Sequence, residues 1–225
     1  MTQFAMIANP GPGKLIVLEG LDGAGTTTQA QCLGDYLRER VRAVTITCEP
    51  TDGPAGRLIR RILTHQDTIH PRALAALFVA DRLDHLYGDR GIAAQLQAGV
   101  WVVMDRYYLS SLAYQSLPLA EHEVPWLYDM HAPCIAPDVT FFLDVPAAVC
   151  LERIRKNRGG AFDLFEKEEL LTAVAARYHA AIQALQTRET IQIVDGTQDK
   201  TSVTGAIQAY LEATFLRGIR ILPLP

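Results

Sequence analysis

The stretch "LIVLEGLDGAGTTTQAQ", Leu15 to Gln31, decides the fold class that we predict for this chain. Its apolar start predicts a buried strand, Gly20, Gly23 and Gly25 predict a tight loop, and the residues that follow predict a helix. A glycine loop between a strand and a helix is typical of phosphate binding, because backbone N–H groups and the helix N-terminus surround the anion. The spacing G-x-x-G-x-G does not fit the dinucleotide pattern G-x-G-x-x-G.

One residue departs from the phosphate-loop pattern G-x-x-x-x-G-K-[ST]. Thr26 stands at the lysine position, and Thr27 keeps the hydroxyl that would face Mg²⁺. Lys14 cannot replace the lysine, because roughly 16 Å of strand separates it from the loop. The richest source of other cations is the run from residue 153 to 158, beside a predicted hinge at residues 157–160. The alternative for this run is a helix end whose cations complement the dipole and stay in solvent.

Five apolar, β-branched runs recur along the chain, with helical patterns between them, at residues 15–18, 43–47, 100–104, 139–143 and 191–194. This alternation predicts a parallel sheet with helices on both faces. A polar group follows each run, namely Glu19, Glu49-Pro50, Asp105-Arg106, Asp144 and Asp195-Gly196. Because ligands bind at the carboxyl ends of strands in open α/β sheets, we expect the site along this edge.

The composition is that of an ordinary globular protein, with 49% hydrophobic and 20% charged residues. No apolar run approaches the roughly 18 residues of a membrane span, and the N-terminus lacks a secretory signal pattern, so we expect a cytoplasmic protein. The net charge of −4 argues against a nucleic acid polymer as partner. Four scattered cysteines and six unpaired histidines predict neither a disulfide framework nor a zinc site, and we expect the thiols to be buried.

The segment "RALAALFVADRLDHLYGDRG", residues 72–91, predicts a helix with a polar stripe. Phe78, Asp81, Arg82 and His85 stand at i, i+3, i+4 and i+7 and therefore share one face. Phe78 could stack on a base while Arg82 binds the nucleotide. The alternative, with equal weight, is Phe78 in the core and Arg82 paired with Asp81 or Asp84.

Asp105 and Arg106 end a fully apolar strand. A charged pair in that place costs desolvation free energy unless it has a ligand or a partner, and strand ends are where ligands lie. The pair is therefore a stronger candidate for a functional site than the helix stripe.

Together these segments resemble the thymidylate kinase family, P-loop enzymes that make dTDP from dTMP and ATP. The likeness runs in one order from about Lys14 to Leu211, through "IVLEGLDGAG", "EPTDGPAGRLIR", "LFVADR", "VVMDRYYLSSLAYQ", "PDVTFFLDVP", "LERIRKNR", "FDLFEKEELLTAVAARY" and "IVDGTQD". The resemblance implies an α/β, three-layer P-loop NTPase fold with a five-stranded parallel sheet, helices on both faces and a short lid. It also implies a homodimer that uses ATP and Mg²⁺.

With the resemblance we expect a single kinase domain over residues 14–218, with a lid at about 153–166. We expect a flexible N-terminal extension at residues 1–13 and a C-terminal tail at residues 219–225.

The resemblance also implies roles for individual residues. Asp22 would meet the sugar 3′-hydroxyl of dTMP, and Phe78 would stack on thymine. Residues implied to bind ATP are Gly20, Asp22, Gly23, Ala24, Gly25, Thr26, Thr27, Thr28 and, near adenine, Asp195. Residues implied to bind dTMP are Asp22, Glu49, Pro50, Phe78, Arg82, Arg106, Ser110, Ser111, Tyr114 and Gln115. The implied catalytic residues are Asp105, Arg106, Arg153 and Arg158, and the implied metal site is Thr27 with Asp105.

Two departures from the family pattern bear on activity. Ala24 stands where one branch of the family carries arginine, so lid arginines would supply the catalytic cation, as in the bacterial branch. Thr26 fits neither branch. A kinase for another nucleoside or nucleotide acceptor therefore remains an alternative, as does a nucleotide-binding protein that lost turnover with its lysine.

Overall fold

The computed structural model describes residues 6–158 and 168–217. Its centre is a parallel five-stranded sheet in the order β2-β3-β1-β4-β5. The strands are β1 (Leu15–Gly20), β2 (Val44–Cys48), β3 (Trp101–Asp105), β4 (Val139–Asp144) and β5 (Ile191–Asp195). The predicted α/β fold with five parallel strands is confirmed.

The strands end one or two residues later than the apolar runs predict. The reason is that the polar residues after the runs still pair within the sheet: Asp105 lies beside Leu18, and Asp144 beside Asp195. The middle strand β1 is fully buried along its whole length, including Glu19. The carboxyl ends therefore bring several carboxylates to one edge of the sheet.

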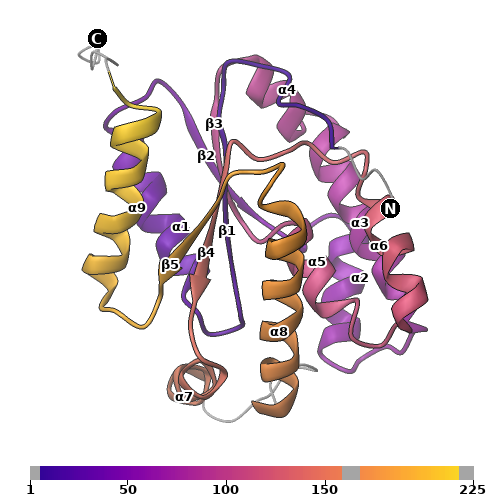
Figure 1. Cartoon of the computed structure of the whole chain (residues 1–225). Helices are drawn as coiled ribbons and strands as arrows, with labels where there is room; N and C mark the ends of the chain where they lie inside the picture. Colours follow the sequence, from indigo (N-terminus) through magenta and orange to yellow (C-terminus); the bar gives the residue numbers. More distant parts are fainter. Residues whose placement is uncertain (1–5, 159–167, 218–225) are drawn as a thin grey trace.

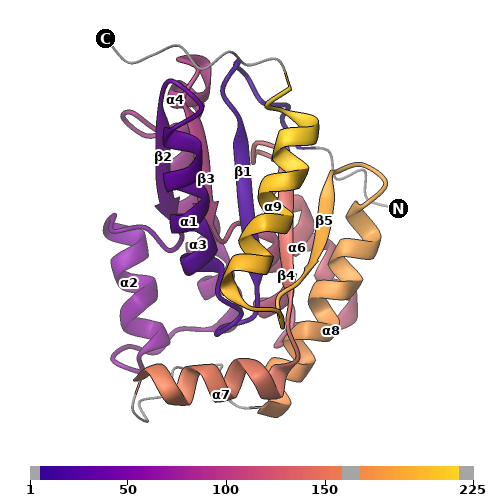
Figure 2. The same ribbon diagram turned by 90° about the vertical axis from the view of Figure 1, so that its left-hand side faces the viewer.

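Helices cover both faces of the sheet, which gives the predicted three layers (Figure 1). On one face lie α1 (Thr26–Arg38) and α9 (Lys200–Thr214), and the main helices of the other face are α3 (Pro71–Tyr87), α5 (Tyr108–Tyr114) and α8 (Glu168–Leu185). Smaller elements are α2 (Pro54–Leu63), α4 (Ile92–Gln97), the 3₁₀ turn η1 (Glu121–Glu123) and α6 (Val124–Met130). Figure 2 shows α7 (Ala147–Arg158) lying across the carboxyl-terminal edge of the sheet.

Residues 6–13, which we expected in a flexible extension, pack against the domain. Ile7 forms a parallel bridge with Ile135. The Asn9 amide donates to Asp138 at 2.7 Å, and the Gly13 N–H donates to the Leu96 carbonyl at 3.0 Å. Backbone and side-chain bonds together therefore hold this segment, whereas residues 1–5 and the predicted tail at 219–225 lie outside the described residues. Within the described residues, no helix has the length and apolar character needed to cross a bilayer.

A partly buried carboxylate far along the chain gives the fold a pH dependence. Burial raises the pKa of Glu189 to about 7, although the Tyr108 hydroxyl donates to it and opposes the shift. At pH values between 4.5, the usual pKa of the side chain, and about 7, Glu189 is protonated more fully in the folded state than in the unfolded state. The contribution of Glu189 to the free energy of unfolding therefore falls as pH rises through this window, on the order of 2 kcal/mol after a discount for partial exposure.

Urea unfolding at pH 5 and pH 8 tests this. From pH 5 to pH 8, the free energy of unfolding is expected to fall by about 2 kcal/mol more in wild type than in Glu189→Gln, because glutamine carries no titrating proton. Parallel stability profiles for the two proteins would contradict the assignment.

Candidate functional site

The loop between β1 and α1 has the backbone geometry of a phosphate cradle. Gly23 and Gly25 have φ values of 85° and 101°, in the region that favours glycine. A Cβ on Gly23 would lie 2.5 Å from the Cys150 carbonyl oxygen, and one on Gly20 would lie 2.9 Å from the Ala24 Cβ. Gly23 is therefore required both by its φ and by the close approach of backbone, Gly25 by its φ, and Gly20 by close packing.

The loop ends at the start of α1, where Thr26 is buried and Thr27 is exposed. The Thr27 hydroxyl donates to Asp105 Oδ2 at 2.5 Å. Asp105 Oδ1 is buried and has no hydrogen-bond partner among residues 6–158 and 168–217. An unsatisfied carboxylate oxygen beside a hydroxyl suits Mg²⁺, which takes oxygen ligands from one or two carboxylates, waters and phosphates. Within the described residues, no group of three His, Cys, Asp or Glu side chains could hold a metal by itself.

Arg106 follows β3 with a φ of 73°, which is rare for a residue with a side chain. Its Nη2 donates to Asp22 Oδ1 at 2.6 Å, and its Nη1 donates to the Gly20 carbonyl at 2.6 Å. Burial opposes the charge, but Asp22 and other neighbours raise the pKa of Arg106 well above its usual value. The guanidinium is therefore a permanent cation fixed to the glycine loop.

A buried carboxylate lies behind this arginine. Glu19 accepts hydrogen bonds from the backbone N–H groups of Tyr107 and Ser110, at 2.8 and 3.1 Å. It also accepts from the hydroxyls of Ser110 and Tyr178, at 2.6 and 3.0 Å. Burial raises the pKa of Glu19, while the Ser110 hydroxyl and the charge of Arg106 oppose the shift.

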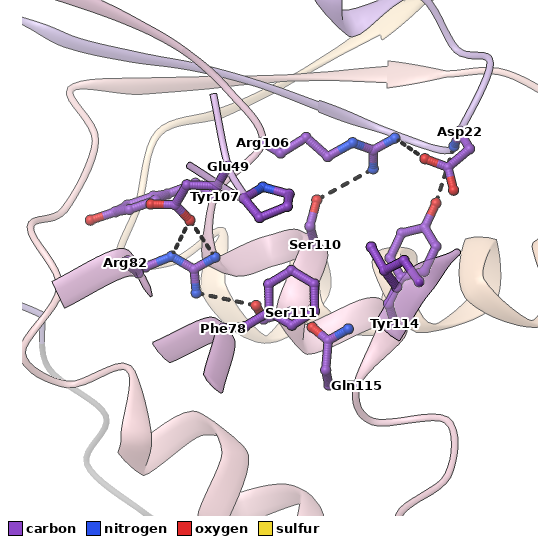
Figure 3. Close-up of a pocket in the computed structure, with 12 residues that line it drawn as sticks. Asp22, Glu49, Phe78, Arg82, Arg106, Tyr107, Ser110, Ser111, Tyr114 and Gln115 are labelled. Atoms are coloured by element: carbon purple, nitrogen blue, oxygen red, sulfur yellow. Dashed lines mark hydrogen bonds and ion pairs between the residues drawn. The ribbon is translucent and has the colours of Figure 1, made fainter. Parts of the chain in front are cut away.

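A small cavity of about 120 Å³ opens beside Arg106. Figure 3 shows its wall, with the Phe78 ring and the Gln115 amide on one side and Arg106 on the other. Arg82 is almost fully buried and pairs with Glu49 Oε2 at 2.7 Å, so neither predicted partner, Asp81 nor Asp84, holds it. The lining residues are Asp22, Glu49, Pro50, Leu63, Phe78, Arg82, Arg106, Tyr107, Ser110, Ser111, Tyr114 and Gln115.

A larger cavity of about 650 Å³ adjoins the first. The glycine loop from Asp22 to Thr28 lines it, together with Asp105, and four cations reach it: Arg60, Arg106, Arg153 and Lys200. Asp22, Glu49, Pro50 and Arg106 line both cavities. The molecule therefore has a compact apolar pocket and a cationic, glycine-lined pocket that meet at Arg106.

The sequence model of the thymidylate kinase family matches residues 18–207, which includes every element that builds the two cavities except the start of β1 and the end of α9. The chain belongs to the thymidylate kinase family.

Individual relatives agree with this assignment. The chain is 37% identical over 207 residues to a protein named probable thymidylate kinase from Thermococcus kodakarensis, covering 88% of this chain and 96% of the relative. It is 34% identical over 203 residues to the thymidylate kinase of Nitrosomonas europaea, covering 89% and 93%. The solved structure of thymidylate kinase from Candida albicans superposes with a TM-score of 0.72 at 25% identity, covering 89% and 92%. The predicted family and P-loop fold are therefore confirmed, and the chain is a phosphotransferase of this family.

The structure brings together nearly all the residues that the sequence singled out for a thymidylate kinase site. Asp195 lies beside the larger cavity rather than in its wall: its carboxylate accepts from Thr197 and Gln198, and its neighbour Gly196 is a lining residue. Arg153, at 3.3 Å from the Ala24 carbonyl and 3.0 Å from the Gly196 carbonyl, connects α7 with the glycine loop. The side chain of Arg158 and the lid residues 159–166 lie outside the described residues.

Several residues that line or support the cavities were not predicted from the sequence. Arg60 donates to the carbonyls of Pro50 and Thr51, and Cys48 is exposed in the larger cavity, so the prediction that the thiols are buried is wrong for Cys48. Arg60 lies in the quoted segment "EPTDGPAGRLIR", which was the available signal. Tyr178 ends the quoted segment "FDLFEKEELLTAVAARY", which was its available signal, whereas Lys200 carries no local pattern that would mark it.

Proposed function

We propose that this chain transfers the γ-phosphate of ATP to dTMP in the two adjoining cavities, giving dTDP and ADP. The observation that carries the proposal is the junction of the two cavities at Asp22 and Arg106. A nucleoside in the smaller cavity would direct its phosphate toward the glycine loop, where the phosphates of ATP would lie. Such an arrangement supports direct transfer between two bound nucleotides, which depends on positioning.

The glycine loop and the first turn of α1 would hold the ATP phosphates through backbone N–H groups. Thr27 and Asp105 would hold Mg²⁺, as the buried and unsatisfied Asp105 Oδ1 supports. The metal would neutralise charge between the β- and γ-phosphates. Arg106 would bind the acceptor phosphate and keep it near the γ-phosphate, because its guanidinium is fixed by Asp22 and the Gly20 carbonyl.

The smaller cavity suits thymine. Phe78 offers an aromatic face for stacking, and Arg82, fixed by Glu49, presents N–H donors. Gln115 Oε1 is buried and has no hydrogen-bond partner within the described residues. The N3–H group of thymine is a donor that would satisfy this oxygen, whereas cytosine has no hydrogen on N3.

Gln115→Leu tests this role. The variant is expected to raise KM for dTMP about 10- to 100-fold, because the donor of the base then loses a buried partner. Gln95→Leu is the matched control, since Gln95 is half-buried, lines neither cavity, and donates its amide N–H to the Arg90 carbonyl at 3.1 Å. Steady-state kinetics with varied dTMP measures both, and an unchanged KM for Gln115→Leu would contradict the assignment.

The same proposal places the protein in the cytoplasm, supported by the sequence pattern. It also includes a homodimer, supported by the family resemblance. The function itself is tested by product formation with ATP, Mg²⁺ and dTMP, with dUMP, dCMP and AMP as competing acceptors.

A further inference from the structure

The Arg106 guanidinium has two different sides. One side faces the cavities and donates to Asp22, which is partly exposed and can exchange partners when a ligand arrives. The other side faces the protein core, where Nη1 lies 3.3 Å from the Tyr178 hydroxyl and 3.4 Å from the Ser110 hydroxyl. These two contacts are long, so their energy alone does not explain how they fix the arginine.

The two hydroxyls are themselves fixed by a third group. Ser110 Oγ and Tyr178 OH lie 2.7 Å apart, and both donate to Glu19 Oε2. Glu19 is completely buried, and its other oxygen holds two backbone N–H groups at the start of α5. Each hydroxyl has one proton, which Glu19 or the neighbouring hydroxyl accepts, so a lone pair of each oxygen remains available for the N–H groups of Arg106.

We infer that Glu19 and Tyr178 are positioning residues for Arg106, acting through the hydroxyls of Tyr178 and Ser110. Glu19 comes from β1, Ser110 from α5 and Tyr178 from α8, so three elements converge behind one guanidinium. Unlike Asp22, Glu19 and Tyr178 are completely buried and line neither cavity, so a bound nucleotide does not displace their partners. They hold Arg106 in its rare backbone conformation and present its remaining donors to the acceptor phosphate.

This inference rests on the proposed function for its kinetic consequence. If Arg106 stabilises the transferring phosphoryl group, a small displacement of its guanidinium lowers kcat more than it raises KM. Tyr178→Phe removes only the hydroxyl. It is expected to lower kcat about 10-fold and to change KM for dTMP less than about 2-fold.

Tyr108→Phe is the matched control. Tyr108 is also a buried tyrosine whose hydroxyl donates to a carboxylate, in this case Glu189, and it lines neither cavity. Its kcat is expected to stay within about 2-fold of wild type even where stability falls. Equal losses of kcat in both variants would show a general packing effect and would overturn the inference.

A double-mutant cycle separates action through Arg106 from an independent role. In an Arg106→Lys background, Tyr178→Phe is expected to cause less than about a 2-fold further loss, because residues that act as a unit are non-additive. The 10-fold loss persisting in that background would overturn the inference. Glu19→Gln, which keeps the shape of the side chain, is expected to behave like Tyr178→Phe.

A measurement without turnover separates this inference from the proposed function. With ¹⁵N-labelled arginine, the guanidinium signal of Arg106 is assigned by its loss in Arg106→Lys. The exchange of the Arg106 guanidinium protons with water is expected to accelerate at least about 10-fold in Tyr178→Phe and to stay unchanged in Tyr108→Phe. Accelerated exchange in a protein that makes no dTDP would reject the proposed function and keep the positioning role, whereas unchanged exchange would reject the positioning role itself.

Discussion

Replacing Arg106 with lysine is expected to lower kcat for dTDP formation about 10²- to 10³-fold, the cost of removing one preorganised donor at a site of developing charge. Lysine keeps the positive charge but loses the planar set of donors that reaches Asp22 and the Gly20 carbonyl together. The ammonium can satisfy one of these partners and leaves the acceptor phosphate poorly held.

Arg38→Lys is the control for this substitution. Arg38 is exposed on α1 and pairs with Asp35, an arrangement whose loss changes stability little. Initial rates at saturating ATP and varied dTMP distinguish the outcomes. A higher KM with an unchanged kcat in Arg106→Lys would show that Arg106 contributes only to ground-state binding, and it would contradict a role of Arg106 in stabilising the transferring phosphoryl group.

The second large effect concerns the threonine in the glycine loop. Thr26→Lys is expected to raise kcat up to about 10²-fold, because a lysine ammonium there neutralises charge between the β- and γ-phosphates. The larger cavity of about 650 Å³, which Thr26 lines, has room for the longer side chain. Thr26→Met is the control of similar length without charge, and it is expected to leave kcat at or below the wild-type value.

The wild-type chain needs another cation to supply part of this charge. Arg153 already contacts the Ala24 and Gly196 carbonyls, so it lies close enough to the glycine loop to turn toward a phosphate. Arg153→Gln is expected to lower kcat more in wild type than in Thr26→Lys, since one cation then compensates for the other. Equal losses in the two backgrounds would contradict compensation, and an unchanged kcat in Thr26→Lys would contradict the expected shortage of positive charge in the wild-type loop.

Most of the fold followed from local sequence patterns. The apolar run at residues 15–18 and the glycines after it predicted β1 and the phosphate cradle, because burial and positive φ each leave a local signal. The same patterns placed Asp105 and Arg106 at the carboxyl edge. The expectation for residues 6–13 was less accurate, since a segment rich in proline and glycine predicts a loop but does not reveal that Asp138 and Leu96 hold it.

Partners distant in sequence could not be predicted in the same way. The sequence offered Asp81 and Asp84 for Arg82 because they are its neighbours, whereas the actual partner, Glu49, directly follows β2. Tyr178 stands on the apolar face of α8, a position that predicts a core residue, which it also is. Its contact with Glu19 depends on how α8 packs over β1, and only tertiary structure shows that.

The most direct test of the proposed kinase activity is the formation of ADP and dTDP by the unaltered chain with ATP and Mg²⁺, comparing dTMP with dUMP, dCMP and AMP. We expect dTDP as the preferred product, formed at a rate that Thr26→Lys increases. Binding of ATP without any phosphorylated product, or a higher rate with another acceptor than with dTMP, would contradict the central claim.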